Sequence, residues 1–325
     1  MPGFTTHYIF GMKAYNDMPF TPLKHTIAKY RWLYQLGLQG PDMFFYNIPI
    51  LRHRDYRNVG SYMHEHKVNA FFECCLRRIG TIRSRQQQEE AISYLAGFIN
   101  HYIADSICHP YVYGRIGYPV DAPTSMHHGM HAHLENELDA ILLWKYKKKK
   151  PSEFNQTATI CLNGQEIQFI SHFLASCINE TYYPITYRNN FQVTPAMVHR
   201  SIWALRFGCR TLSDKNGKKK FGIAQVESIF VNHPVASAKM VTDSVTDYRS
   251  SCNLNHEAWI NPWDPTRVST ASFVDLFHET LDKCSRVYAL LNSAVTDNMP
   301  LDKQDLSPLL AELGNESYHS GLSVE

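Results

Sequence analysis

His101-Tyr-Ile-Ala-Asp105-Ser-Ile-Cys-His109 places three polar residues four positions apart. The stretch ends a helix predicted over residues 86–108, in which apolar residues recur at helical spacing and which Pro110 is expected to stop. Four residues advance an α-helix by about 400°, so successive side chains of this set drift by only about 40°. All three therefore project from one stripe of the helix.

The other faces of this helix are apolar, so we expect the helix to be buried in an all-α protein. A buried stripe of His101, Asp105 and His109 is destabilising unless its groups are paired or bind a metal. A single histidine here would more often be an ordinary core residue, but three polar residues in register favour a metal site.

A second stretch, His131-Ala-His133-Leu-Glu135-Asn-Glu-Leu-Asp139, repeats the pattern in a helix predicted over 129–144. His131 and Glu135 are again four residues apart, and Asp139 continues the line. Two such helices can face each other in a bundle core, and imidazole with carboxylate suits catalytic zinc. The alternative is a network of internal salt bridges. A thermolysin-like peptidase is not supported, because His-Glu-x-x-His is absent.

Three isolated residues are further candidates to complete the site. His7 opens a predicted N-terminal helix, Asp42 follows Gly40-Pro41, and His64 lies near the start of a helix over 61–79. Taken alone, each has an ordinary explanation as an exposed histidine or a capping aspartate.

The composition excludes several classes of protein. The 325 residues carry a formal net charge of +2, which gives no global field to attract nucleic acid or a membrane surface. There is no signal peptide and no apolar run long enough to cross a bilayer, so a cytoplasmic protein is expected. The eight cysteines include no Cys-x-x-Cys pair, which indicates reduced thiols and argues against a thiolate zinc finger.

The pattern along the chain predicts three regions. Residues 1–150 form a zinc-binding helical core. Residues 151–297 continue the helices on the same core, with a β-hairpin near 157–169 around Asn163-Gly164. Residues 298–325 form a loose polar tail, apart from a short Leu-rich turn near 306–313. The run Lys145–Lys150 is interpreted as a solvated linker, with a patch for anionic lipid as the alternative.

Five motifs together resemble the zinc-dependent phospholipase C family over residues 2–145. They are Pro2-Gly-Phe-Thr-Thr-His7, Gly40-Pro-Asp42-Met-Phe-Phe-Tyr46, Met63-His64, Gly97-Phe-Ile-Asn-His101-Tyr-Ile-Ala-Asp105-Ser-Ile-Cys-His109-Pro110 and His131-Ala-His-Leu-Glu135-Asn. Trp259-Ile-Asn-Pro-Trp263-Asp-Pro is also similar to uncharacterised bacterial members, and we interpret it as a structural aromatic cluster.

The resemblance implies a multi-helix bundle, shared with S1/P1-type nucleases, that holds three zinc ions. Carried over to this sequence, a third ion would bind His7 and share Asp105 as a bridge. The other two sets are Asp42, His64, His101 and Asp105 for the first ion, and His109, His131 and Glu135 for the second.

Two departures from the family pattern matter. The secreted enzymes complete the third site with an N-terminal tryptophan, for which this chain offers only Pro2 after Met1, so two or three ions are expected. The step from Asp105 to His109 is also short for the family, which leaves His127 and His128 as alternatives to His109.

The function implied is phosphodiester hydrolysis by metal-activated water, with Asp42 as ligand and general base. The expected substrate is a glycerophospholipid, cut on the glycerol side of phosphate, with peripheral membrane contact. A nuclease or soluble phosphodiesterase is the first alternative, and a non-catalytic metal-binding interaction protein is the second.

Overall fold

A computed structural model describes residues 3–46, 59–182, 192–211, 218–230 and 247–325, together with residues 214, 237, 240, 242, 243 and 245. The helices of the first half are α1 (Phe4–Asp17), α2 (Pro22–Lys29), α3 (Arg31–Gly37), the 3-10 helix η1 (Gly40–Tyr46), α5 (Val59–Glu65), α6 (Val68–Thr81), α7 (Arg85–Arg115) and α8 (Ser125–Lys147).

The second half contains the short 3-10 helices η2 (Pro151–Glu153) and η3 (Gln156–Thr159), then α9 (Gly164–Tyr182), α11 (Pro195–Thr211), α12 (Lys218–Phe230) and α13 (Tyr248–Ser251). A hairpin of β1 (Trp259–Asn261) and β2 (Asp264–Ser269) precedes α14 (Phe273–Thr296) and α15 (Ser307–Leu313). The all-α bundle predicted from the sequence is confirmed. No helix of the described residues is long and apolar enough to cross a membrane.

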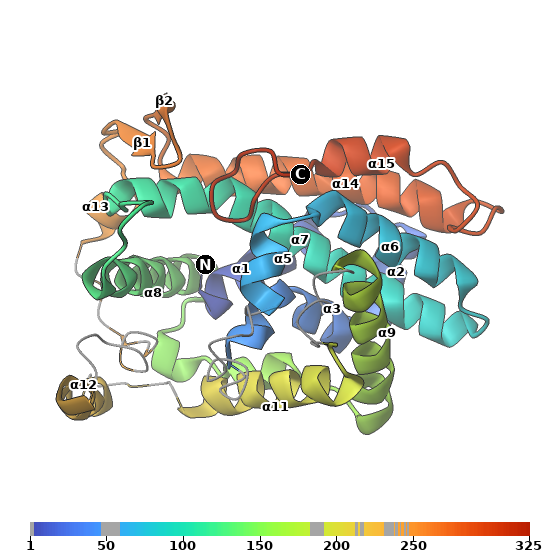
Figure 1. Ribbon diagram of the computed structural model, residues 1–325, viewed down its shortest axis with the longest axis horizontal. Coiled ribbons are helices and arrows are strands. Elements are labelled where there is room, and N and C mark those ends of the chain that lie inside the picture. Colours follow the sequence, from blue (N-terminus) through green and yellow to red (C-terminus); the bar gives the residue numbers. More distant parts are fainter. Residues whose placement is uncertain are drawn as a thin grey trace.

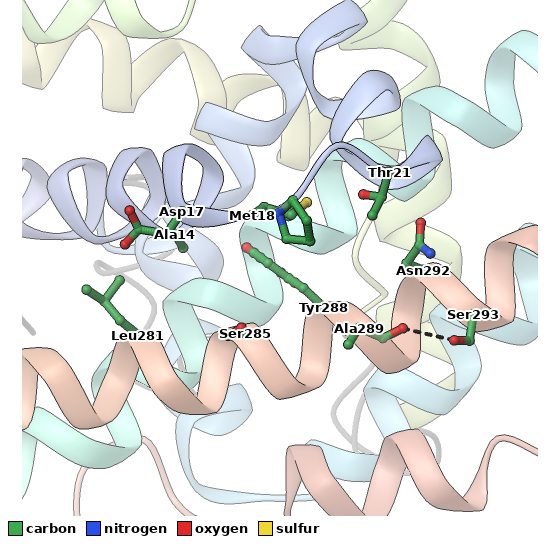
Figure 2. Close-up of a pocket in the computed structure, with 11 residues that line it drawn as sticks. Ala14, Asp17, Met18, Thr21, Leu281, Ser285, Tyr288, Ala289, Asn292 and Ser293 are labelled. Carbon is green, nitrogen blue, oxygen red and sulfur yellow. Dashed lines mark hydrogen bonds between the residues drawn. The ribbon is translucent and has the colours of Figure 1, made fainter.

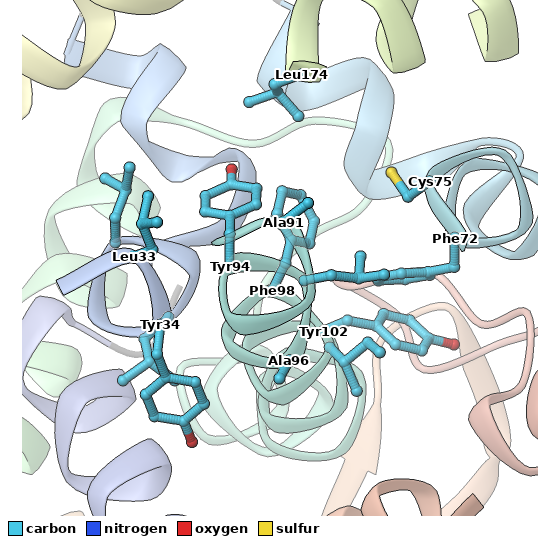
Figure 3. Close-up of a cluster of buried hydrophobic side chains, with 14 of the residues drawn as sticks. Leu33, Tyr34, Phe72, Cys75, Ala91, Tyr94, Ala96, Phe98, Tyr102 and Leu174 are labelled. Atoms are coloured by element: carbon cyan, nitrogen blue, oxygen red, sulfur yellow. The ribbon is translucent and has the colours of Figure 1, made fainter. Parts of the chain in front are cut away.

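Helix α7 is the central element of the bundle (Figure 1), and its neighbours include α1, α3, α6, α9 and α14. Its apolar residues Tyr94, Phe98 and Tyr102 are buried among side chains from α3, α6 and α9 (Figure 3). Ser84 caps the N-terminus of α7: its hydroxyl accepts the N–H of Gln87 and so satisfies one of the unpaired amides of the first turn.

Helix α3 crosses α7 at two facing glycines. A Cβ atom on Gly37 would lie 2.1 Å from the carbonyl oxygen of Tyr94, and one on Gly97 would lie 2.0 Å from that of Tyr34. Only glycine permits so close an approach of two backbones. The crossing places the chain that follows α3, including η1, beside the C-terminal half of α7.

The prediction of a β-hairpin near 157–169 is wrong, because this range contains most of η3 and the start of α9. Asn163 and Glu166 instead form reciprocal side-chain to backbone hydrogen bonds of 2.9 and 2.8 Å, which start α9 as a capping box. The hairpin of the described residues lies at 259–269, in the segment interpreted as an aromatic cluster.

Two further predictions need correction. Helix α7 does not stop at Pro110 but continues to Arg115. The Leu-rich turn expected near 306–313 is helix α15, but the residues after it are not loose, because Ser317, Tyr318 and Ser320 are buried. Sequence composition cannot reveal this packing, since it depends on contacts with helices far away in the chain.

Candidate metal centre

The first group of candidate ligands comes from three elements that meet beside α7. Asp42 on η1, His64 on α5, and His101 and Asp105 on α7 each offer one ligand atom, and these atoms all lie within 4.8 Å of one another. The Nε2 atom of His101 is 3.1 Å from Oδ2 of Asp105, and Nε2 of His64 is 3.3 Å from Oδ1 of Asp42. We call these four residues the first cluster.

Gly40 explains how Asp42 reaches this position. Its φ of +46° lies in the left-handed region, and a Cβ atom there would lie 2.2 Å from the ring of His101. The backbone therefore turns directly against the imidazole, and Asp42 follows within the first turn of η1.

A second cluster lies one turn further along α7. It consists of His109 together with His131 and Glu135 from α8, whose ligand atoms also lie within 4.8 Å of one another. Nε2 of His131 is 2.6 Å from Oε1 of Glu135, and Nε2 of His109 is 3.6 Å from the same oxygen. The predicted spacing of four residues on both helices thus brings imidazole and carboxylate together.

His7 on α1 lies beside the first cluster. Its Nε2 is 3.2 Å from Oδ1 of Asp105, and its ring stacks on His101 with centroids 4.0 Å apart. Asp105 consequently faces His7 with one oxygen and His101 with the other, as a bridging carboxylate would. Met1 and Pro2, on which the third site was expected to depend, lie outside the described residues.

Several atoms that face the clusters have the properties of metal-ligand atoms. They are buried and make no hydrogen bond among the described residues, although such groups are normally satisfied. This holds for both oxygens of Asp105, Oδ1 of Asp42, and Nε2 of His7, His64, His101 and His109.

The opposite ring nitrogens are held by backbone carbonyls. Nδ1 of His64 contacts the oxygen of Gly60 at 2.6 Å, Nδ1 of His101 that of Leu38 at 3.1 Å, and Nδ1 of His109 that of Tyr318 at 2.6 Å. A carbonyl can only accept, so Nδ1 carries the proton and the lone pair of Nε2 points into the cluster. This arrangement is typical of metal-binding histidines, and the donor set fits zinc.

The pKa values of Asp105 and His109 also favour the protonation states that bind a metal. Burial alone would raise the pKa of the Asp105 carboxyl, but His109, His101 and His7 nearby lower it well below its ordinary value. Burial lowers the pKa of His109 to about 3. At neutral pH the carboxylate is charged and this imidazole is neutral, which are the forms that bind a cation.

The alternatives to His109 lie elsewhere. Nδ1 of His127 is 2.8 Å from the hydroxyl of Thr124 and helps to begin α8, while His128 is exposed. Asp139 also differs from the expectation that it continues the ligand line. Its two oxygens accept the amides of Thr5 and Thr6 at 3.1 and 2.7 Å and so hold the first turn of α1, which carries His7.

Aromatic residues also line the second cluster; the sequence indicated an aromatic cluster around Trp263 but gave no signal for Tyr113 or Tyr118. Trp263, at the tip of the hairpin, meets the ring of Tyr113 edge-on at 4.8 Å, and Tyr113 lies 4.5 Å from His131. Tyr118 contacts both Tyr113 and Trp263. We call Tyr113, Tyr118 and Trp263 the aromatic wall of the second cluster.

One pocket of about 330 Å³ lies away from both clusters, between the end of α1 and α14 (Figure 2). Asp17, Tyr288 and Asn292 are among its lining residues. None of the predicted ligands lines it.

Comparison with known proteins gives one match. The model of a family described as zinc-dependent phospholipase C matches residues 6–186, more than half of the chain. No match was found among curated proteins or among solved structures. The matched region contains every residue of both clusters and His7, and it ends before α11.

Proposed function

Because the chain belongs to the zinc-dependent phospholipase C family, we propose that it hydrolyses a glycerophospholipid on the glycerol side of the phosphate. The observation that carries this proposal is the first cluster. Both oxygens of Asp105, Oδ1 of Asp42 and Nε2 of His64 and His101 are buried there without a hydrogen bond among the described residues, while carbonyl groups hold the opposite ring nitrogens of the two histidines. A purely structural polar network would satisfy these atoms internally.

Zinc bound in such clusters polarises phosphoryl oxygens, lowers the pKa of bound water and neutralises charge in the transition state. We assign to Asp42 the role of the general base that accepts a proton from the attacking water. Its Oδ1 faces His64 and His101 in the first cluster, which leaves Oδ2 to orient the water and to accept its proton. The leaving alcohol takes a proton from solvent, so the reaction is a simple hydrolysis.

The aromatic wall supports a second candidate function. Flat rings beside a metal cluster can stack on a nucleobase, as a nuclease of the S1/P1 type requires. The same rings can also cover the apolar part of a lipid. The two substrates are therefore compared directly in the experiment below.

Helix α11 supports peripheral contact with a lipid surface. Trp203 and Phe207 are 63% and 54% exposed and stack on each other with centroids 5.3 Å apart. The helix also carries Arg200, Arg206 and Arg210 and no acidic residue. Exposed aromatic rings among cations are typical of helices that rest on anionic membranes.

The decisive experiment is a hydrolysis screen of the zinc-loaded protein against phosphatidylcholine vesicles, monomeric short-chain phospholipid, single-stranded nucleic acid and a simple phosphodiester. We expect phospholipid to be the preferred substrate and Asp42→Asn to lower its turnover by about 10²-fold or more. Asp17→Asn is the matched control, because Asp17 is exposed and lines the distant pocket.

Zinc must be measured in the same samples, because the asparagine can also weaken the first cluster. Turnover of nucleic acid alone would replace the proposed substrate by the second candidate. No turnover of any phosphodiester by fully loaded protein would refute the enzymatic proposal, and normal turnover in Asp42→Asn would remove this residue as the base.

A further inference from the structure

Residues 316–324 return to the metal centre after α15, and we call them the C-terminal hook. Figure 1 shows this part of the chain crossing α7 close to α5. The hook is fastened to α7 by Tyr102, whose hydroxyl donates to Oε2 of Glu316 at 2.6 Å and accepts the N–H of Glu316 at 2.9 Å. Asn261 of the β-hairpin holds it at a second point by donating to the carbonyl of Ser320 at 2.8 Å.

The hook also occupies the irregular point of α7. Pro110 has no N–H to offer to the carbonyl of Ser106, and Gly321 lies over this place. A Cβ atom on Gly321 would be 2.6 Å from the oxygen of Ser106, and the φ of +60° favours glycine as well. The close fit leaves no room for a side chain at position 321 while the hook lies in this place.

This position brings the hook into contact with both clusters. The carbonyl of Tyr318 is the acceptor for Nδ1 of His109 at 2.6 Å, and the N–H of Tyr318 donates to the carbonyl of His64 at 2.9 Å. The ring of His319 lies 4.9 Å from that of His64 and 5.8 Å from that of His109. The hook therefore spans the boundary between the first and second clusters.

We infer that the C-terminal hook is a positioning element of the second cluster, which holds His109 in the orientation and tautomer that bind a metal. The inference rests on the metal occupancy assumed in the proposed function. It goes beyond the family, because the hook lies more than 100 residues after the end of the matched region. The first cluster differs, since its own Nδ1 atoms are held by Gly60 and Leu38.

Two pairs of variants test this role in the 325-residue chain. Gly321→Ala forces a Cβ atom against α7, whereas Gly117→Ala introduces the same strain, at a φ of +61°, with no atom within 4 Å. Tyr102→Phe removes both hydrogen bonds to Glu316. Tyr94→Phe removes a buried hydroxyl from the same helix that has no hydrogen-bond partner among the described residues.

The measured quantity is the affinity for each zinc ion, obtained from a titration with a competing chelator. The binding step that is absent from the titration of His131→Ala is the step that belongs to the second cluster. Gly321→Ala and Tyr102→Phe should weaken that step by about 10- to 100-fold, the usual effect of removing the hydrogen-bond partner of a ligating histidine. Gly117→Ala and Tyr94→Phe should leave it unchanged.

A loss confined to the second cluster in either hook variant supports the inference. Unchanged affinities in both hook variants, or equal weakening of both clusters, would overturn it, since a general structural role predicts no selectivity. The measurement does not use hydrolysis. A protein inactive on every phosphodiester would thus refute the proposed function and leave this inference standing.

Discussion

Replacing Asp105 by asparagine should remove the zinc of the first cluster and leave that of the second. The side chain is fully buried and lies 3.2 Å from His7, 3.1 Å from His101 and 3.8 Å from His64 through its two oxygens. Asparagine has nearly the same volume as aspartate but no charge, so the substitution leaves no cavity. A loss of stability can then be attributed to the lost metal. The second cluster keeps all three of its ligand residues.

The expected size of the effect follows from binding linkage. A ligand at about 1,000 times its dissociation constant stabilises the folded state by about 4 kcal/mol, so two clusters contribute about 8 kcal/mol. At about 2 °C per kcal/mol, zinc should raise the melting temperature of the wild type by about 16 °C. Asp105→Asn should keep about half of this rise and bind one ion fewer.

The assay combines elemental analysis with thermal melting in the presence and absence of a chelator. His7→Ala should lose less than Asp105→Asn, because His7 touches a single oxygen of one carboxylate. Glu90→Gln is the control, as it neutralises a buried carboxyl on the same helix, bonded only to Gln86 among the described contacts. Full zinc content in Asp105→Asn, or loss of the ions of both clusters, would refute the assignment of Asp105 as a ligand of the first cluster alone.

Two further outcomes are expected. His319→Ala should keep its zinc but lower hydrolysis by at least about tenfold. Its ring is 20% exposed and lies 4.9 Å from that of His64 and 5.8 Å from that of His109, so we expect it to donate a hydrogen bond to a phosphate bound at the clusters, and such a bond to a charged group contributes about 1.5–3 kcal/mol. Unchanged kcat and KM would contradict this. Zinc-free protein should lose stability as the pH falls from about 6.5 towards 3. In the unfolded chain His109 takes up a proton near pH 6.5, whereas in the folded protein burial lowers its pKa to about 3, so a falling pH favours the unfolded state. A chemical unfolding midpoint that stays constant from pH 7 to pH 4 would argue against this titration.

The sequence predicted the parts of the centre that depend on local periodicity. His101, Asp105 and His109 lie on one stripe of α7 because residues four apart share a helix face, and this requires no knowledge of the fold. His131 and Glu135 on α8 follow by the same rule. Placing His7, Asp42 and His64 beside them needed the family resemblance, because nothing in their local sequence indicates which helix they face.

The remaining parts depend on contacts between distant segments. Asn163-Gly164 is a frequent hairpin turn, but the glutamate two positions later forms a capping box that outweighs this preference. The roles of Tyr318 and His319 were not predictable, since a carbonyl oxygen has no signature in a sequence and the polar composition of residues 298–325 suggests solvent exposure. Trp263 was noticed, but its neighbour Tyr113 is 150 positions earlier in the chain.

The hydrogen bond between His109 and Tyr318 also sets the order in which the protein can mature during synthesis. The two residues are 209 positions apart, a distance that a ribosome covers in about 10–40 s at 5–20 residues per second. Throughout this interval α7 and α8 can emerge and pair while His109 lacks its partner. Metal that arrives earlier would meet a second cluster whose His109 is not yet held, so the inferred role of the hook predicts that this cluster binds its metal more tightly once the hook has emerged and docked.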